Sequence, residues 1–350
     1  MQEIKIINKV NVSKLVDMMT PETMFDLSSK AFYYASKSLA QIPERLCLSS
    51  PEHKLLVMPS LITRQGEIVK LVGIPLSSNG LSSSSVVLSP TTGSLEFVLN
   101  SEAITAIRTA SGSALITKAI NLDSPKVLLI FGSGLQAYWH IKILLKVLPS
   151  IDKVIIFSRS SASAERLVLS IKPEFATTCF SFGQLGDLGQ SDKPSSELKS
   201  TLNMADIICS CTPSEIPFIY GSLLKEGVHM NCIGSYTPDM QEFDLETVKN
   251  STIFVDSVKM VLKEAGEIIH AKESIPSLEL LELGHFVAIH NSDQKESFTL
   301  DTDKIQEAIR RKGRKFTLFK SVGIATQDLT LTCQICTMAE QHNLYDKVLF

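Results

Sequence analysis

The chain has 350 residues, which is long for one domain and natural for two. Hydrophobic residues make up 44% of it and charged residues 20%, so it can bury a sizeable core, and wholesale disorder is not expected. The formal net charge is −3, from 34 basic and 37 acidic residues. This balance offers no basic excess for binding nucleic acid or an anionic membrane surface.

The N-terminal stretch and the cysteines bear on where the protein works. Residues 1–19 mix charges among apolar residues, unlike a signal peptide, and no apolar run reaches the roughly 18 residues of a membrane span. The seven cysteines are scattered, and the Cys333–Cys336 pair has no second pair to match it. Zinc or disulfides remain alternatives, but the pattern favours buried free thiols in a reducing cytosol, and thus a cytoplasmic protein without a metal site.

The first third of the chain mixes helical and strand patterns. Residues 13–36 have helical spacing, with Pro21 and Glu22 opening a helical turn. Residues 77–85, rich in serine, predict a polar loop, and residues 101–120 predict a helix with small residues at its centre. Short apolar runs and a hairpin turn at Pro90 to Gly93 predict strands at 54–60, 66–75, 84–90 and 94–100.

From Lys126 onward, apolar strand patterns alternate with helical ones. This alternation is typical of crossover units and predicts an α/β protein with a doubly wound parallel sheet covered on both faces. Residues 183–200 are polar and predict a surface loop, and the last helical segments are expected near 316–329. The predicted strands lie at 126–131 and 153–158 and within 205–213, 228–235 and 252–257, and the predicted helices at 135–148 and 161–172.

A glycine-rich turn follows the first of these strands. It has the pattern G-x-G-x-x-A, between an apolar strand and an amphipathic helix. Gly132 permits the tight turn, Gly134 lets a pyrophosphate approach the backbone, and Ala137 lets the helix pack on its strand. The helix N-terminus then offers free N–H groups and a positive dipole end to phosphate. We predict a nucleotide site, against the alternative of a turn without a ligand, formed by Gly132, Ser133, Gly134, Leu135 and Gln136.

The end of the second strand bears on which nucleotide is bound. NAD-binding proteins usually place Asp or Glu there to hold the ribose hydroxyls. This chain has Ser158, Arg159 and Ser160 instead. A guanidinium with hydroxyl donors suits the 2′-phosphate that an aspartate would repel, so these residues predict NADP(H) over NAD(H). The alternative is that Arg159 is a solvated surface residue.

With these residues, the chain resembles the ornithine cyclodeaminase/mu-crystallin family over nearly its whole length. Several blocks in the family's order are more specific than the glycine motif alone. The matching stretches are VMPS (57–60), EAITAIRTASGSALITKA (102–119), GSGLQAYWH (132–140), ADIICSCTPSEIP (205–217), GVHMNCIGS (227–235), VDSVKMVLKEAGEI (255–268) and FKSVGIATQDL (319–329).

The resemblance implies two domains and a homodimer. Residues 1–120 together with 321–350 would form an α/β substrate-binding and dimerisation domain, and residues 121–320 a Rossmann-type NADP-binding domain. It also implies a substrate that is a small imine or amino acid bearing a carboxylate.

The resemblance also implies site residues. Arg45, Lys70 and Arg108 match positions that contact substrate in the family, and Lys70 and Arg108 are the catalytic candidates. Ser82 stands in a Gly-Leu-Ser-Ser stretch where many relatives have larger polar residues facing the nicotinamide. The remaining expected cofactor contacts are Thr109, Thr212, Ile233 and Ser321.

One departure from the family limits the chemistry. Cyclodeaminases carry an aspartate in a G-D-x-P-G-K pattern after the fifth Rossmann strand, where this chain has Tyr236. Asp239, three residues on and after Pro238, does not simply replace it. Ornithine cyclisation, and any reaction that begins by deprotonating an amine, is therefore disfavoured. Tyr236 is expected either to bond near the substrate nitrogen or, as the favoured alternative, to pack.

Each charged candidate has a second interpretation. Arg45 would anchor a substrate carboxylate, but it could also pair with Glu44 on the surface. Lys70 would bind the carboxylate or relay a proton, but it could be an exposed edge lysine. Arg108 could pair with a structural carboxylate. Lys320 would stabilise a cofactor phosphate or lie on the surface, and Trp139 and His140 are expected to pack between helix and sheet.

Three functions remain open at this stage. The favoured one is an NADPH-dependent oxidoreductase that transfers hydride to the C=N bond of a cyclic ketimine carboxylate, of the pyrroline- or piperideine-2-carboxylate type. Such a substrate can take its proton from solution, so no aspartate is needed at position 236. The alternatives are an alanine- or opine-type amino-acid dehydrogenase, which needs a base that the sequence does not reveal, and a nucleotide-gated small-molecule binder with little turnover.

Overall fold

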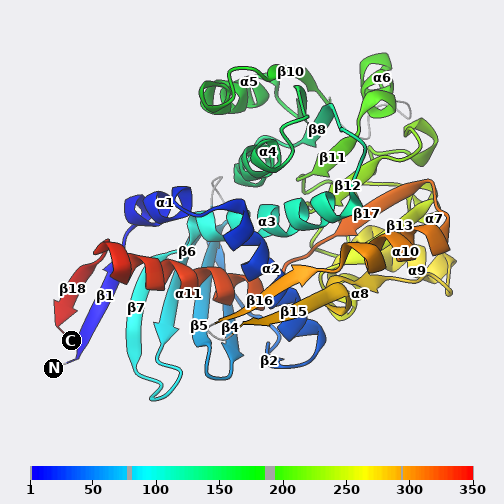
Figure 1. The fold of residues 1–350 in the computed structure, drawn as a ribbon. Coiled ribbons are helices and arrows are strands. Elements are labelled where there is room, and N and C mark those ends of the chain that lie inside the picture. Colours follow the sequence, from blue (N-terminus) through cyan, green and yellow to red (C-terminus); the bar gives the residue numbers. More distant parts are fainter. Residues whose placement is uncertain (1, 77–80, 186–193, 293–294, 350) are drawn as a thin grey trace. The chain divides into compact units, whose positions relative to one another are not determined.

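The computed structural model describes residues 2–76, 81–185, 194–292 and 295–349. They form two compact units (Figure 1): Met1–Arg108, Ile289–Thr299 and Gly323–Phe350 make the first, and Thr109–Ala288 and Leu300–Val322 the second. The boundary therefore lies within the helix at 102–120, not after it. The segment 289–299, expected in the Rossmann domain, belongs to the first unit.

An eight-stranded sheet is the framework of the first unit. Its order is β18-β1-β7-β6-β5-β4-β2, with β3 paired to β4. The described pairs are antiparallel except β1 with β7. The four strands expected between residues 54 and 100 are confirmed. The strands are β1 (Glu3–Ile7), β2 (Ala40–Gln41), β3 (Leu46–Ser49), β4 (His53–Ile62), β5 (Gly66–Pro75), β6 (Ser82–Leu88), β7 (Leu95–Asn100) and β18 (Asp346–Leu349).

The first unit also contains the helices α1 (Lys9–Asp17), α2 (Pro21–Ser36) and α11 (Ala325–His342). The side chain of Thr20 accepts a hydrogen bond from Thr23 N and Pro21 opens α2, so the expected helical turn begins there. Helix α11 contacts α2, β4 and β5, and α1 contacts β7. The long helix α3 (Glu102–Ile120) runs from the first unit into the second, and a hairpin is formed by β15 (Val287–Ser292) and β16 (Lys295–Leu300).

The predicted serine loop is wrong in its second half. Residues 77–80 lie outside the described residues, but Ser82 to Ser85 open strand β6 and pair with β5. Ser83 and Ser85 are buried, and Ser101 Oγ donates to Ser85 Oγ at 2.6 Å. Because the Ser85 hydroxyl finds a partner in Ser101, a buried serine can stand in this strand without the apolar alternation from which the strand could have been predicted.

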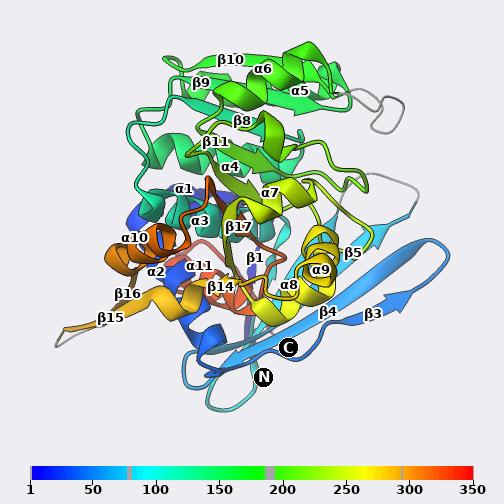
Figure 2. The ribbon, with the colours of Figure 1, turned by 90° about the vertical axis from the view of Figure 1, so that its right-hand side faces the viewer.

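A parallel eight-stranded sheet is the framework of the second unit. Its order is β10-β9-β8-β11-β12-β17-β13-β14, and every neighbouring pair is parallel. Figure 2 shows β10, β9, β8 and β11 following one another in this order. The predicted doubly wound α/β fold is confirmed. The strands are β8 (Val127–Phe131), β9 (Lys153–Ser158), β10 (Cys179–Gln184), β11 (Ile207–Ser210), β12 (His229–Cys232), β13 (Ser251–Val255), β14 (Leu281–Glu282) and β17 (Phe316–Lys320).

The connections of this sheet correct two predictions. Residues 316–320 form the buried strand β17, paired on both sides, and helix begins only at Ala325. Residues 183–200 were expected to form a loop. Instead, β10 extends to Gln184 and α6 starts at Ser196, and residues 186–193 lie outside the described residues. The helices of this unit are α4 (Leu135–Val147), α5 (Ser161–Ile171), α6 (Ser196–Met204), α7 (Leu245–Lys249), α8 (Val258–Glu264), α9 (Gly266–Ser274) and α10 (Thr302–Lys312), with short 3-10 turns at Lys172–Glu174, Gly221–Leu223 and Leu283–Phe286.

The strand order positions the expected nucleotide turn. Strand β8 lies between β9 and β11. From β8 the chain first adds β9 and β10 on one side, and it then returns to add β11 and β12 on the other side. In open parallel sheets, ligands bind beyond the carboxyl ends of the strands at such a switch point. The glycine turn follows β8, and the segment with Thr212 follows β11. Both therefore lie where this fold places a ligand.

Two fully buried histidines of this unit make its stability depend on pH. His140 Nδ1 donates to Gln136 O at 2.8 Å, so its Nε2 accepts from Ser113 Oγ at 2.9 Å. Burial lowers the pKa of His140 and of His229 to about 4. The unfolded chain binds these protons near pH 6.5, so stability present above pH 6.5 is lost as the pH falls toward 4, by roughly 3 kcal/mol per histidine.

This loss is measured by urea unfolding at pH 7, 5.5 and 4.5. Carboxylates contribute near the acid end, so His140→Gln, which removes one of the two groups, serves as the control. The variant should lose less stability than the wild type between pH 7 and 4.5. Equal losses in the two proteins would contradict the assignment to His140.

Three further observations concern the surroundings of the chain. Across the described residues, no helix combines the length and apolar character needed to cross a bilayer. All seven cysteines are free thiols; Cys209, Cys232 and Cys336 are buried, whereas Cys47 and Cys179 are exposed, contrary to the expectation of buried thiols. Among the same residues, no group of three or more His, Cys, Asp or Glu side chains is arranged to hold a metal ion.

Candidate functional site

The turn after β8 requires glycine at its first position. Gly132 has φ +107°, a conformation that side-chain-bearing residues rarely adopt. A Cβ atom placed there would lie 2.9 Å from the carbonyl oxygen of Cys211, at the end of β11. Gly132 N donates to Phe157 O of β9 at 2.8 Å. Gly132 therefore lies where the neighbouring strands β9, β8 and β11 end close together, and the turn begins there.

Gly134 occupies a different environment. It is the N-cap residue of α4 in an extended conformation, with φ −86°, and as a glycine it offers no side chain to cap the first turn of the helix. An added Cβ would meet no protein atom within 4 Å. The protein itself therefore does not require glycine here, and the free space borders the N-terminal N–H groups of a helix. This arrangement fits a phosphate group approaching the backbone. Ala137, one turn on, is fully buried against the sheet.

A cavity of about 880 Å³ in the second unit adjoins this turn. Its volume suits a large ligand such as a dinucleotide. It collects seven of the predicted cofactor residues, namely Gly132, Ser133, Gly134, Ser158, Arg159, Ser160 and Thr212. Leu135 and Gln136 begin helix α4 beside it. Its other lining residues are Ser163, Leu185, Cys211, Pro213, Ser214, Glu215 and Ile216.

The end of β9 forms one corner of this cavity. Ser158 is buried and its Oγ donates to Ser160 O at 2.7 Å, which shapes the turn into α5. Arg159 is exposed, and among the described residues no carboxylate pairs with it. On the first turns of α5, Arg166 donates to Ser163 Oγ at 2.8 Å. The corner is therefore rich in hydroxyls and cations, as a phosphate site requires.

A buried carboxylate that sequence analysis missed organises the neighbouring loops. Glu242 is fully buried and accepts four hydrogen bonds. Thr212 N and Thr212 Oγ1 donate to its Oε1 at 2.8 Å each, and Ser210 Oγ and Gly234 N donate to its Oε2 at 2.9 and 2.8 Å. Burial raises the pKa of Glu242, and Lys320 opposes this. Glu242 thus holds together the loops after β11 and β12, which carry the expected contacts Thr212 and Ile233.

The last residue of β17 and the residue after it bond to other segments at the carboxyl end of the sheet. Lys320 is fully buried; its Nζ lies 3.2 Å from Glu267 Oε1 and donates to Ser235 O at 2.7 Å. The surface alternative for Lys320 is therefore wrong. Ser321 is 2% exposed and donates to Asp256 Oδ2 at 2.8 Å, and Ile233 is 8% exposed. Neither residue lines the cavity of the second unit.

Two predicted substrate residues meet at a buried carboxylate in the first unit. Lys70 of β5 donates to Asp328 Oδ1 at 2.8 Å, and Arg108 Nε of α3 lies 3.3 Å from the same oxygen. Lys70 is 1% exposed and Arg108 8%, and β5 lies between two strands, so the interpretation of Lys70 as an exposed edge lysine is wrong. Asp328, at the start of α11, was not predicted. We call these three residues the Asp328 cluster.

Charge and burial act in opposite directions within this cluster. Burial would raise the pKa of Asp328, but Lys70 and Arg108 outweigh it, so the pKa lies below its ordinary value. Burial lowers the pKa of Lys70; Asp328 opposes this, and Arg108 and Arg45 add to it. Arg108 also donates to Gln327 Oε1 at 3.2 Å. Its guanidinium lies on Gly323, where a Cβ would be 2.6 Å from a terminal nitrogen.

The remaining predicted residues differ in exposure. Arg45 is half-buried just before β3, and its charge reaches Lys70. Tyr236 is 49% exposed, so the favoured interpretation as a packing residue is wrong. Ser82 is exposed at the start of β6, whereas Thr109 is 3% exposed within α3. Trp139 and His140 are buried on α4, as expected for packing residues.

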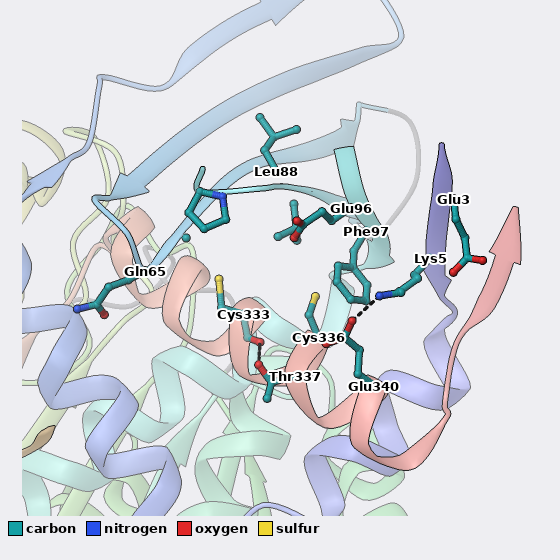
Figure 3. A pocket seen from close by; sticks show the side chains of 13 residues that line it. Glu3, Lys5, Gln65, Leu88, Glu96, Phe97, Cys333, Cys336, Thr337 and Glu340 are labelled. Carbon is teal, nitrogen blue, oxygen red and sulfur yellow. Dashed lines mark hydrogen bonds and ion pairs between the residues drawn. The ribbon is translucent and has the colours of Figure 1, made fainter. Parts of the chain in front are cut away.

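A second cavity, of about 400 Å³, lies in the first unit (Figure 3). Cys333 and Cys336 of α11 line it with Phe97 of β7, and Lys5 pairs with Glu340 at its edge. Burial raises the pKa of Cys333 to about 11, so its thiol stays protonated near neutral pH. No residue predicted to bind substrate or cofactor lines this cavity.

A doubly wound parallel sheet with a G-x-G-x-x-A turn at its switch point defines a dinucleotide-binding protein of the Rossmann class. Residues 2–343 match the model of the ornithine cyclodeaminase/mu-crystallin family. The chain belongs to this family, as the sequence resemblance predicted.

Individual relatives cover much of the chain. "Ketimine reductase mu-crystallin" of Macropus fuliginosus is 32% identical over 239 residues, which span 68% of this chain and 63% of that protein, just under two thirds of it. "Delta(1)-pyrroline-2-carboxylate reductase" of Colwellia psychrerythraea is 28% identical over 71% of each chain. The structure of the Thermococcus litoralis reductase of the same name, in complex with NADH and L-proline, matches with a TM-score of 0.78 and 21% identity, covering 99% of this chain and 100% of that one.

Proposed function

We propose that this protein is an NADPH-dependent reductase of cyclic ketimine carboxylates, of the pyrroline-2-carboxylate or piperideine-2-carboxylate type. Its relatives at 28 to 32% identity carry the names ketimine reductase and pyrroline-2-carboxylate reductase, and both names describe reduction of C=N bonds. These names support the proposal of an NAD(P)-dependent oxidoreductase. The observation that carries the substrate proposal is the Asp328 cluster, because it holds two buried cations against one carboxylate.

The second unit would hold the cofactor. Gly134 and the first turn of α4 would receive the pyrophosphate, and Arg159 with Ser158 and Ser160 would receive a 2′-phosphate. When bound, the nicotinamide supplies the hydride. The absence of a carboxylate at the end of β9 supports NADP(H) over NAD(H). The other residues proposed to contact the cofactor are Ser82, Thr109, Gly132, Ser133, Leu135, Gln136, Thr212, Ile233 and Ser321.

The first unit would hold the substrate. Arg108 and Lys70 would bind its carboxylate, with Arg45 as a further cation nearby. Such an anchor fixes which face of the C=N bond receives hydride, and the reacting carbons must come within about 3 to 3.5 Å. The Lys70 ammonium could also relay a proton toward the imine nitrogen, and the exposed hydroxyl of Tyr236 could hydrogen-bond near that nitrogen. Because the imine takes its proton from solution, no aspartate at position 236 is needed.

We also propose a homodimer that works in the cytosol. In antiparallel strands, directly opposed residues share one face. One face of β4 to β7 is apolar and only half-buried in the single chain, and it continues into Leu46 and Leu48 of β3, which are 63% and 61% exposed. A sedimentation mass equal to one chain would count against the dimer. The face comprises Leu55, Val57, Pro59, Val69, Leu71, Val86 and Val98.

The proposed cytosolic location rests on the free cysteines, which suit a reducing compartment.

The function is tested by NADPH oxidation against a panel of substrates. Δ1-pyrroline-2-carboxylate and Δ1-piperideine-2-carboxylate should each be reduced faster than pyruvate supplied with ammonia or methylamine, and ornithine with NAD⁺ should give no proline. The same panel run with NADH should be slower. Oxidation with pyruvate and an amine, but with neither imine, would identify an amino-acid dehydrogenase instead. No oxidation with any substrate would leave a binding protein.

A further inference from the structure

The Asp328 cluster brings together three elements that lie far apart in the sequence. Lys70 comes from β5, Arg108 from α3 and Asp328 from the first turn of α11, and all three belong to the first unit. Both cations contact the same oxygen, Oδ1, at 2.8 and 3.3 Å. Oδ2 of Asp328 is buried and has no hydrogen-bond partner among the residues that the structure describes. Asp328 thus contacts both cations through a single carboxylate oxygen.

Neighbouring groups restrict the two cations further. Thr105 Oγ1 accepts a hydrogen bond from Lys70 Nζ. Gln327 accepts from Arg108 Nη1 through its Oε1 and donates from its Nε2 to Arg108 O at 3.2 Å, so side chain and backbone of the arginine are both held. Gly323 has φ +84° and leaves room for the guanidinium. These contacts fix the orientation of both cations before any substrate arrives.

The charges of the cluster do not balance. Lys70 and Arg108 contribute two positive charges and Asp328 one negative charge, in a place where each side chain is at most 8% exposed. A buried charge without a counter-ion is costly, so one uncompensated positive charge favours binding of one anion. A bound monocarboxylate would neutralise the cluster. Without Asp328, two adjacent cations would repel each other and Lys70 would tend to lose its proton.

We propose that Asp328 is the positioning residue of the substrate site: it holds the Lys70 ammonium and the Arg108 guanidinium side by side and leaves one positive charge to bind a monocarboxylate. This inference rests on the proposed function for the identity of the substrate. The groups that face Lys70 are Thr105 and Arg108 from α3, Asp328 from α11 and Arg45 from the segment before β3. Asp328 is the carboxylate among them, so its removal lowers the pKa of Lys70.

The test compares wild type with Asp328→Asn in the full chain. Calorimetry measures binding of pyrrole-2-carboxylate, a planar anion that cannot be reduced, in the presence of NADP⁺ between pH 6 and 10. We expect roughly 10- to 100-fold weaker binding, because Lys70 without Asp328 tends to lose its proton and with it the charge-assisted contact to the anion. Binding should also decline at a lower pH than in the wild type, since Lys70 deprotonates earlier. Affinity for NADP⁺ itself should not change.

Asp206→Asn is the matched control. Asp206 pairs with Lys225 and lies before β11, at the end of the sheet opposite the glycine turn. Its loss should lower stability without changing the affinity for the anion or the pH at which binding declines. A purely structural role for Asp328 would make the two variants alike. Equal anion affinity and an unshifted pH dependence in Asp328→Asn would overturn the inference.

A second pair of variants covers the case in which Asp328→Asn does not fold. Lys70→Met removes one of the two cations, and Lys70→Met combined with Asp328→Asn then leaves Arg108 without its anchor. Lys70→Met alone leaves the cluster neutral, whereas the double variant keeps one uncompensated positive charge on Arg108. The anion should therefore bind more tightly to the double variant than to the single one, and equal binding would overturn the inference. Calorimetry needs no turnover, so anion binding that depends on Asp328, without reductase activity, would refute the proposed function and leave the inference standing.

Discussion

Gly134→Val is expected to weaken dinucleotide binding strongly and to leave the fold of the second unit intact. Gly134 has φ −86°, which valine adopts readily, and an added Cβ meets no protein atom within 4 Å. The side chain instead occupies the space beside the N-terminus of α4 that we assign to the pyrophosphate. Loss of one or two charge-assisted bonds predicts at least about 100-fold weaker binding. Fluorescence titration with NADPH measures the affinity, and circular dichroism and the melting temperature report on the fold.

Gly132→Ala is the control, and the opposite result is expected. Gly132 has φ +107°, and a Cβ there would lie 2.9 Å from Cys211 O, a backbone atom that cannot easily move. This strain should cost roughly 1 to 3 kcal/mol of stability and lower the melting temperature. If Gly134→Val bound NADPH like the wild type, the ligand would not approach the backbone at this turn, and the assignment of the cavity would fail.

Local patterns predicted most of the fold. The strands β5 and β9 were predicted over their full ranges, because each is a short run rich in apolar and β-branched residues that ends at a residue typical of turns. Strand β17 was misjudged as part of a helical region, since five buried residues beside a helix have no period that separates the two structures. Strand β6 opens with four serines, of which Ser83 and Ser85 are buried, and the local sequence does not reveal that Ser101 supplies the hydroxyl partner of Ser85.

The candidate site was only half predictable, for a physical reason. Lys70 and Arg108 were proposed as substrate residues from a family resemblance, but the carboxylate between them lies 258 and 220 positions away along the chain. No spacing rule connects residues so far apart. A signal was nevertheless present: a charged residue in a mainly apolar helix must find a partner, and Arg108 in α3 therefore called for a carboxylate. Asp328, beside Gln327 in a matching family block, was the residue to consider.

The buried acids Asp328 and Glu242 share one arrangement. Each binds groups from segments that are distant in sequence, and each holds residues proposed to contact substrate or cofactor. Burying a carboxylate is costly unless its bonds are satisfied, so such residues are better explained by orientation than by stability. The pKa of Asp328 is lowered by its two cations and that of Glu242 is raised by burial, and carboxylates with a perturbed pKa cluster at functional sites.

Arg159→Asp should reverse the choice between the two nicotinamide dinucleotides. The substitution removes the exposed guanidinium at the end of β9 and places a negative charge beside the expected 2′-phosphate, which itself carries close to two negative charges. The affinity for NADPH should fall by on the order of 100-fold or more. The affinity for NADH should change little or improve, because a carboxylate at this position can accept bonds from the ribose hydroxyls. Parallel titrations with the two nucleotides measure the ratio.

Arg166→Asp separates direct contact from general electrostatics. It makes the same change of charge on the next turns of α5, where Arg166 donates to Ser163 at the edge of the cavity. A long-range effect of charge would weaken NADPH binding equally in both variants and would diminish in 0.5 M salt, since screening shortens its reach to a few Å. A direct bond from Arg159 makes the loss much larger in Arg159→Asp and preserves it at high salt. Equal losses for NADPH and NADH would show that Arg159 does not recognise the 2′-phosphate.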